Sequence, residues 1–114
     1  MGTWGVEIFE DDVACDVRGA VHELFAESKS MQEVTDIVLE KFSAFGLDED
    51  DGPVVMFALA AAQSEVGRVD PRIKEKALEL IDRGVDPRWR ERVEYRSKRA
   101  KVLGDLATKL RSSQ

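Results

Sequence analysis

The sequence predicts an all-α fold: a compact bundle of about five helices that forms a single domain over residues 1–114. Apolar side chains recur at three- and four-residue spacings through most of the chain, which is typical of amphipathic helices. No segment alternates apolar and polar residues for long enough to predict a strand. Helix-start signals recur along the chain and divide it into five helical segments.

The segment from Gly52 to Gly67 is predicted to be the central helix of the bundle. It carries no charge from Val54 to Ala62, and a helix that is apolar on all sides is buried on most of them. Its four alanines remove bulk and let neighbouring helices approach closely. The apolar run is too short to cross a bilayer, which needs about 20 residues.

The first helix is predicted from Asp12 to Glu27, with Asp11 or Asp12 as the residue that caps its N-terminus. Val13, Val17 and Val21 recur at helical spacing along it. Gly19 interrupts this helix and predicts a close crossing with another helix.

The second helix has a clearer start. Ser30 and Glu33 form a capping box, in which each side chain accepts a hydrogen bond from the backbone of the other residue. Its apolar stripe is predicted to include Ile37 and Phe42. Gly46 is predicted to end the helix, because glycine is favoured just after a helix C-terminus.

The sequence Val-Asp-Pro-Arg occurs twice, at 69–72 and at 85–88. Each copy predicts a helix start, with Asp as the N-cap and Pro at the first helical position. The helix after the first copy is predicted to stop at Gly84. The helix after the second copy is predicted to be the longest and to pack along a partner helix over about 30 Å. Its packing stripe is predicted to be Trp89, Val93, Arg96, Ala100, Leu103, Ala107 and Leu110.

Charge is unevenly distributed along the chain. Residues 1–52 carry 14 acidic and 3 basic side chains, a net charge of −11, whereas residues 53–114 carry 9 acidic and 14 basic ones, a net charge of +5. This asymmetry can mark a binding face. It can also mean that acidic helices lie beside basic ones, and we favour this internal pairing as the main cause.

We expect no metal, no cofactor and no catalytic residue. Cys15 and His22 lie two helical turns apart, about 10 Å, which is too far to share a metal ion or to form a thiolate–imidazole pair. The loop from Asp48 to Asp51 lacks the flanking ligands of a calcium loop. The sequence contains no phosphate-binding loop, dinucleotide fingerprint or nucleophile elbow.

Arginines and lysines are concentrated between Arg88 and Lys101, and such a run can contact phosphates. Glu91 and Glu94 interleave with it, however, and we predict no aromatic stacking platform beside it. A solvated or internally paired face is therefore the favoured interpretation.

Two acidic groups, at 7–16 and at 48–51, suggest a different surface. Acidic patches can occupy the basic substrate cleft of an enzyme that acts on nucleic acids. The alternative is that the first group only caps a helix and that the second is a solvated loop. The residues predicted to contact a partner are Asp12, Asp16, Asp48, Asp50 and Asp51.

The opening Gly2-Thr3-Trp4-Gly5, followed by Phe9-Glu10-Asp11-Asp12-Val13-Ala14-Cys15-Asp16, resembles the signature of a bacterial domain-of-unknown-function family numbered 4259. Asp11 stands where that family often has Asn, and Cys15 where it often has a large apolar residue. The resemblance extends over nearly the whole chain. It implies a small, mostly helical, intracellular bacterial protein without an established activity, of a kind often suspected to be an immunity factor.

The leading hypothesis is a non-enzymatic protein-binding module, in its most specific form an immunity or inhibitor protein whose acidic face docks on a toxin or another basic protein. A nucleic-acid-binding protein that uses the basic C-terminal helix and a small enzyme built on carboxylates remain the alternatives. A single cysteine and the lack of a signal peptide or membrane segment predict a cytoplasmic protein. The oligomeric state stays open.

Overall fold

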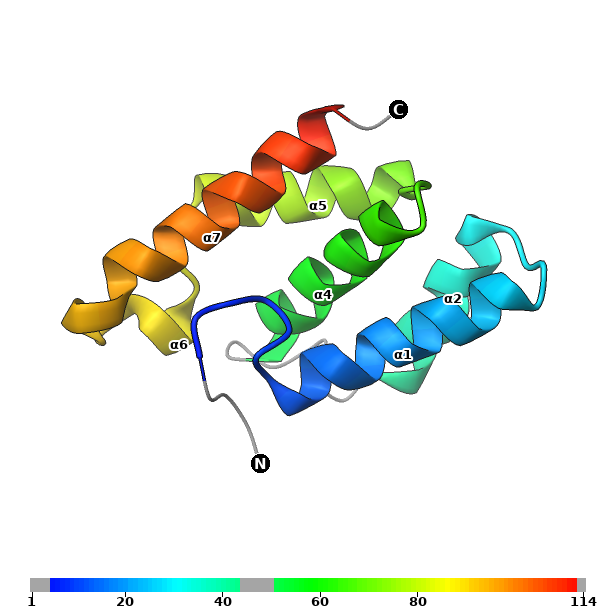
Figure 1. Ribbon diagram of the computed structural model, residues 1–114, viewed down its shortest axis with the longest axis horizontal. Coiled ribbons are helices and arrows are strands. Elements are labelled where there is room, and N and C mark those ends of the chain that lie inside the picture. The colour runs from blue at the N-terminus through cyan, green and yellow to red at the C-terminus, as the bar shows by residue number, and fades with distance from the viewer. Residues whose placement is uncertain (1–4, 44–50, 113–114) are drawn as a thin grey trace.

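The computed structural model describes residues 5–43 and 51–112 (Figure 1). Within these two ranges the chain is helical and contains no strand, so the all-α prediction is confirmed. None of the described helices is long and apolar enough to cross a membrane. The helices are α1 (Asp12–Ala26), α2 (Met31–Lys41), α4 (Asp51–Glu65), α5 (Pro71–Asp82), α6 (Pro87–Arg90) and α7 (Val93–Ser112).

Helix α4 lies at the centre of the fold, as predicted. It packs against α1, α5 and α7, while α2 packs against α1, and α6 packs against α7. In Figure 1, α1 and α2 lie on one side of α4. Helices α5, α6 and α7 lie on its other side. Most of α4 is buried because its apolar side chains point to all sides: Val54, Val55, Phe57, Ala58, Leu59, Ala60 and Ala62.

The predicted caps fix the starts of three helices. The Asp11 side chain accepts a hydrogen bond from the backbone N–H of Ala14 and begins α1, and Ser30 and Glu33 form the complete capping box of α2. Asp70 caps α5, which is followed by Gly84 at a φ of 104°. These signals are readable in sequence because each depends on residues a few positions apart.

Two predictions for α1 and α2 are wrong. Helix α2 ends at Lys41, with Phe42 as its C-cap, rather than at Gly46, which lies outside the described residues. Gly19 does not mark a helix crossing: it is exposed, and a Cβ atom added there would meet nothing within 4 Å. The glycine instead leaves open space on the surface of α1.

The prediction of one long C-terminal helix with a continuous packing stripe is also wrong. The helix is interrupted after Arg90, where α6 ends, and α7 begins at Val93. Val93, Arg96 and Ala100, all in the predicted stripe, are exposed. The rest of the predicted stripe is confirmed, since Trp89, Leu103, Ala107 and Leu110 are buried; Arg99 and Leu106 complete the buried face of α7.

A buried ion pair contributes to the packing face of α7. The Arg99 guanidinium donates to both carboxylate oxygens of Asp86, at 3.1 and 3.3 Å, and to the carbonyl of Val6 at 2.7 Å. Asp86 therefore makes no side-chain cap to α6. This pair ties the N-terminal segment, the start of α6 and the body of α7 together.

Gln63 performs a similar role between α2, α4 and α5. Its amide nitrogen donates to the Thr35 hydroxyl at 2.8 Å, and its amide oxygen accepts from the backbone N–H of Asp70 at 2.8 Å. All three side chains are buried. Because a buried polar group without a partner is costly, this chain of hydrogen bonds fixes one relative position of the three helices.

Candidate functional site

The predicted partner-binding residues that the structure describes lie on α1. Asp12 and Asp16 are exposed and one helical turn apart, so they lie on the same face of this helix. Asp48 and Asp50 lie outside the described residues. Asp51 is the first residue of α4, and its side chain is not described. The structure therefore brings two of the five residues together and does not place the acidic loop.

Asp16 lines a groove of about 540 Å³ between α1 and α2. We refer to it as the α1–α2 groove. Its lining combines apolar and charged side chains: Cys15, Asp16, Gly19, Ala20, Glu23, Leu24, Ile37, Val38, Lys41 and Phe42.

The floor of the α1–α2 groove is apolar and partly open. Val38 and Phe42 are buried, Leu24 is half-buried, and Ile37 is 40% exposed. Ile37 belongs to the predicted apolar stripe of α2, yet no helix of the described chain covers it. Gly19 widens the groove because no side chain projects from that position.

The α1 edge of this groove is acidic. Asp16 and Glu23 are exposed, and within the described part of the chain neither makes an ion pair. On the other edge, the Lys41 ammonium lies 5.8 Å from the centroid of the Phe42 ring. The groove thus offers an apolar surface beside two carboxylates that have not been neutralised.

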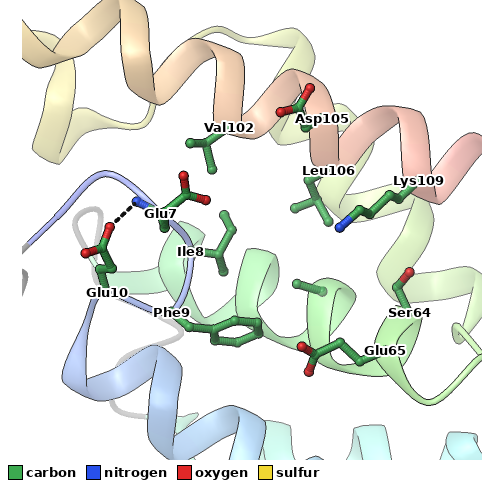
Figure 2. A pocket seen from close by; sticks show the side chains of 11 residues that line it. Glu7, Ile8, Phe9, Glu10, Ser64, Glu65, Val102, Asp105, Leu106 and Lys109 are labelled. Atoms are coloured by element: carbon green, nitrogen blue, oxygen red, sulfur yellow. Dashed lines mark hydrogen bonds between the residues drawn. The ribbon is translucent and has the colours of Figure 1, made fainter.

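The first acidic group of the sequence contributes to a second groove, which Figure 2 shows. Glu7, Ile8, Phe9 and Glu10 of the N-terminal segment lie between the C-terminal part of α4 and α7. This groove has a volume of about 530 Å³; Asp105 and Lys109 of α7 line it, and the Lys109 side chain extends toward it. We call it the N-terminal groove.

Two carboxylates of the N-terminal groove are already used by the fold. Glu65 binds the Arg18 guanidinium at 2.9 Å and contacts the His22 ring nitrogen at 3.1 Å. Glu10 accepts the backbone N–H of Glu7 at 3.2 Å and folds over Gly5, where a Cβ atom would collide with its carboxylate. These contacts give Glu10 and Glu65 structural roles, so this groove is the weaker candidate for binding a charged partner.

The described ion pairs give little support to internal pairing as the cause of the charge asymmetry. Internal pairing would join carboxylates of residues 1–52 to basic side chains of residues 53–114. Among the described ion pairs, one does so: Asp36 with Arg72, at 3.1 Å. Pairs such as Arg83 with Glu79 lie within the second half. Among the described carboxylates of α1, Asp16 and Glu23 therefore remain available to other charges.

Cys15 and His22, the residues considered for catalytic or metal-binding chemistry, make separate contacts. The Cys15 thiol donates to the carbonyl of Phe9 at 3.0 Å, whereas His22 contacts Glu65 of α4. Over the described ranges, no group of three or more His, Cys, Asp or Glu side chains is arranged to hold a metal ion.

The basic C-terminal region differs from its prediction in one way. Tyr95 is 44% exposed and its ring meets the ring of Trp89 at 6.2 Å, so an aromatic side chain does accompany the basic run. Arg99 is paired with Asp86, but within the described residues Arg92 and Lys98 make no ion pair. Both cations are exposed, which agrees with the solvated alternative of the prediction.

A family model described as a domain of unknown function (DUF4259) matches residues 2–110. The match covers nearly the whole chain and confirms the resemblance seen in the opening motif. No curated protein and no solved structure matches this sequence.

Proposed function

This chain belongs to the DUF4259 family of domains of unknown function, and we propose that it is a non-enzymatic protein-binding module. Its α1–α2 groove docks a basic, amphipathic helix of a protein partner. The observation that carries the proposal is the apolar floor of this groove, with Ile37 40% exposed, beside the carboxylates of Asp16 and Glu23.

The shape of the groove favours a helix as the docked element. A groove between two packed helices accepts the apolar face of a third helix, a common mode of peptide recognition. Gly19 would let that third helix approach α1 closely, because no side chain occupies the space above it. Burial of the exposed part of Ile37 would then contribute to binding.

The charge of the groove favours a basic partner. Asp16 and Glu23 would face lysines or arginines that flank the apolar residues of the docked helix, and Asp12 would extend this acidic edge by one turn. Such complementarity accelerates association and makes it sensitive to salt. The acidic residues of the 48–51 loop are retained in the proposal as further contacts.

The most specific form of the proposal is a bacterial immunity or inhibitor protein in the cytoplasm. The acidic edge of α1 would occupy a basic cleft, such as the substrate cleft of a toxin that acts on nucleic acids. The described chain contains one free cysteine, Cys15, which suits a reducing compartment.

The test is a pull-down from the native host with the tagged protein, washed at low and at high salt. We expect one stoichiometric protein partner that is lost at high salt. Gly19→Leu should abolish its capture, because the new side chain fills the groove. Asp16→Lys combined with Glu23→Lys should weaken capture by reversing the charge of the acidic edge.

Gly104→Leu is the matched control, because Gly104 is also an exposed helical glycine with nothing within 4 Å of an added Cβ atom. It lies on α7 and should leave capture unchanged. Equal loss of the partner in the Gly19→Leu and Gly104→Leu variants, or full capture by both, would refute docking in the α1–α2 groove.

A further inference from the structure

A third cavity lies at the opposite end of the molecule from α2. It has a volume of about 390 Å³ and is bounded by the N-terminal segment, α6 and the start of α7. We call it the α6–α7 cleft. The lining residues used below are Val6, Glu10, Trp89, Arg92, Tyr95 and Lys98.

One side of the cleft is aromatic. Trp89 is buried, and the ring of Tyr95 meets it edge-on, with centroids 6.2 Å apart and an interplanar angle of 76°. Tyr95 itself is 44% exposed. The contact with Trp89 holds the Tyr95 ring in place while nearly half of this residue stays accessible, which is the requirement for a stacking surface.

The same side of the cleft carries two cations, Arg92 and Lys98. The Arg92 guanidinium lies 5.1 Å from the centroid of the Trp89 ring. In the chain as described, neither Arg92 nor Lys98 has an ion-pair partner, whereas Arg99 nearby is bound to Asp86. The first turn of α7 begins directly after Arg92, and its helix dipole adds positive potential.

We propose that the α6–α7 cleft binds a nucleotide unit, with the base stacked on Tyr95 and the phosphate held by Arg92 and Lys98. Proteins hold bases and phosphates without sequence preference by combining an aromatic ring, on which the base stacks, with neighbouring cations that bind the phosphate. The volume of the cleft is within the range of small-molecule sites.

The cleft also has a polarity that orients this ligand. Glu10 lines it from the N-terminal segment, and its carboxylate accepts the backbone N–H of Glu7. A phosphate would be repelled by Glu10 and is therefore placed on the side of Arg92 and Lys98. The N–H groups of a base are compatible with the Glu10 side.

The nucleotide unit can be a free nucleotide or part of a single-stranded nucleic acid, and two probes distinguish these sources. The first is AMP, followed by calorimetric titration at low salt. The second is a fluorescein-labelled 12-nucleotide single strand, followed by fluorescence anisotropy in the same buffer. Binding of AMP assigns the site to a free nucleotide, and binding of the 12-mer alone assigns it to a strand.

Tyr95→Leu should weaken binding about 5- to 100-fold, because it removes the stacking ring but keeps an apolar side chain. Tyr95→Phe should retain binding. Arg92→Glu and Lys98→Glu should each reduce binding further. Arg68→Glu is the matched control, since Arg68 is exposed, lies in the α4–α5 connection and changes the net charge equally.

The proposal is overturned if neither probe binds the wild-type protein at low salt. It is also overturned if Arg68→Glu weakens binding as much as Arg92→Glu does, because the attraction would then be non-specific. The α6–α7 cleft is separate from the α1–α2 groove, so loss of nucleotide binding in Tyr95→Leu should leave capture of the protein partner intact.

Discussion

The buried pair of Asp86 and Arg99 should be the most sensitive point of the fold. The two side chains are 1% and 4% exposed, and two hydrogen bonds of 3.1 and 3.3 Å join them. Asp86→Ala leaves the guanidinium buried without its counter-charge. Removal of one partner of a buried pair costs about 3–5 kcal/mol of unfolding free energy.

For a chain of 114 residues, this loss corresponds to a melting temperature lower by about 12–20 °C. Urea unfolding followed by circular dichroism gives the free energy directly. The control is Arg83→Ala, which breaks an exposed pair with Glu79 and should cost at most about 1 kcal/mol.

A double-variant cycle separates the pair from other contacts of Arg99. Arg99 also donates to the carbonyl of Val6 and lies 5.5 Å from the centroid of the Trp89 ring. The double variant Asp86→Leu with Arg99→Met leaves no buried charge. Its loss of unfolding free energy should therefore be smaller than the sum of the losses in the two single variants. An Asp86→Ala variant as stable as Arg83→Ala would refute the reasoning.

Three further predictions concern stability. Gly19→Ala and Gly104→Ala should each stabilise the protein by about 0.5–1 kcal/mol in urea unfolding, because both glycines lie in helices with free space around them; a loss of stability would show that the open space is misassigned. Ser30→Ala should cost about 1 kcal/mol, because it removes the capping box of α2; an unchanged urea midpoint would contradict this role. Burial alone would raise the pKa of Asp70, but hydrogen bonds from the side chain and backbone N–H of Arg72 outweigh burial and hold this pKa below its ordinary value. The stability that Asp70 contributes is present above about pH 4 and is lost as the pH falls through its lowered folded-state pKa. Asp70→Asn should therefore flatten the acid side of the stability profile, and an unchanged slope would contradict this assignment.

The central helix and the helix caps could be predicted from sequence because they depend on local residues. The uncharged run of α4 needs no partner to indicate burial, and Ser30 with Glu33 forms a capping box within one turn. The break between α6 and α7 could not be predicted in this way. The sequence does not show that Arg99 pairs with Asp86 either, because this ion pair joins residues 13 positions apart through the tertiary fold.

The candidate site was predictable only in part. Asp16 could be singled out as an acidic residue on α1, but the groove that it lines exists only where α1 packs on α2. The helical spacing of Ile37 places it in the predicted apolar stripe of α2, yet its side chain is 40% exposed and no described helix covers it. Its exposure depends on which helices are present, which spacing alone does not encode.

Docking of a basic helix between α1 and α2 can be observed at individual residues. The most direct test is an NMR titration of the ¹⁵N-labelled protein with the partner recovered in the pull-down. We expect the largest chemical-shift changes at Asp16, Gly19 and Ile37, around the α1–α2 groove. Changes confined to α7, with α1 and α2 unaffected, would contradict it.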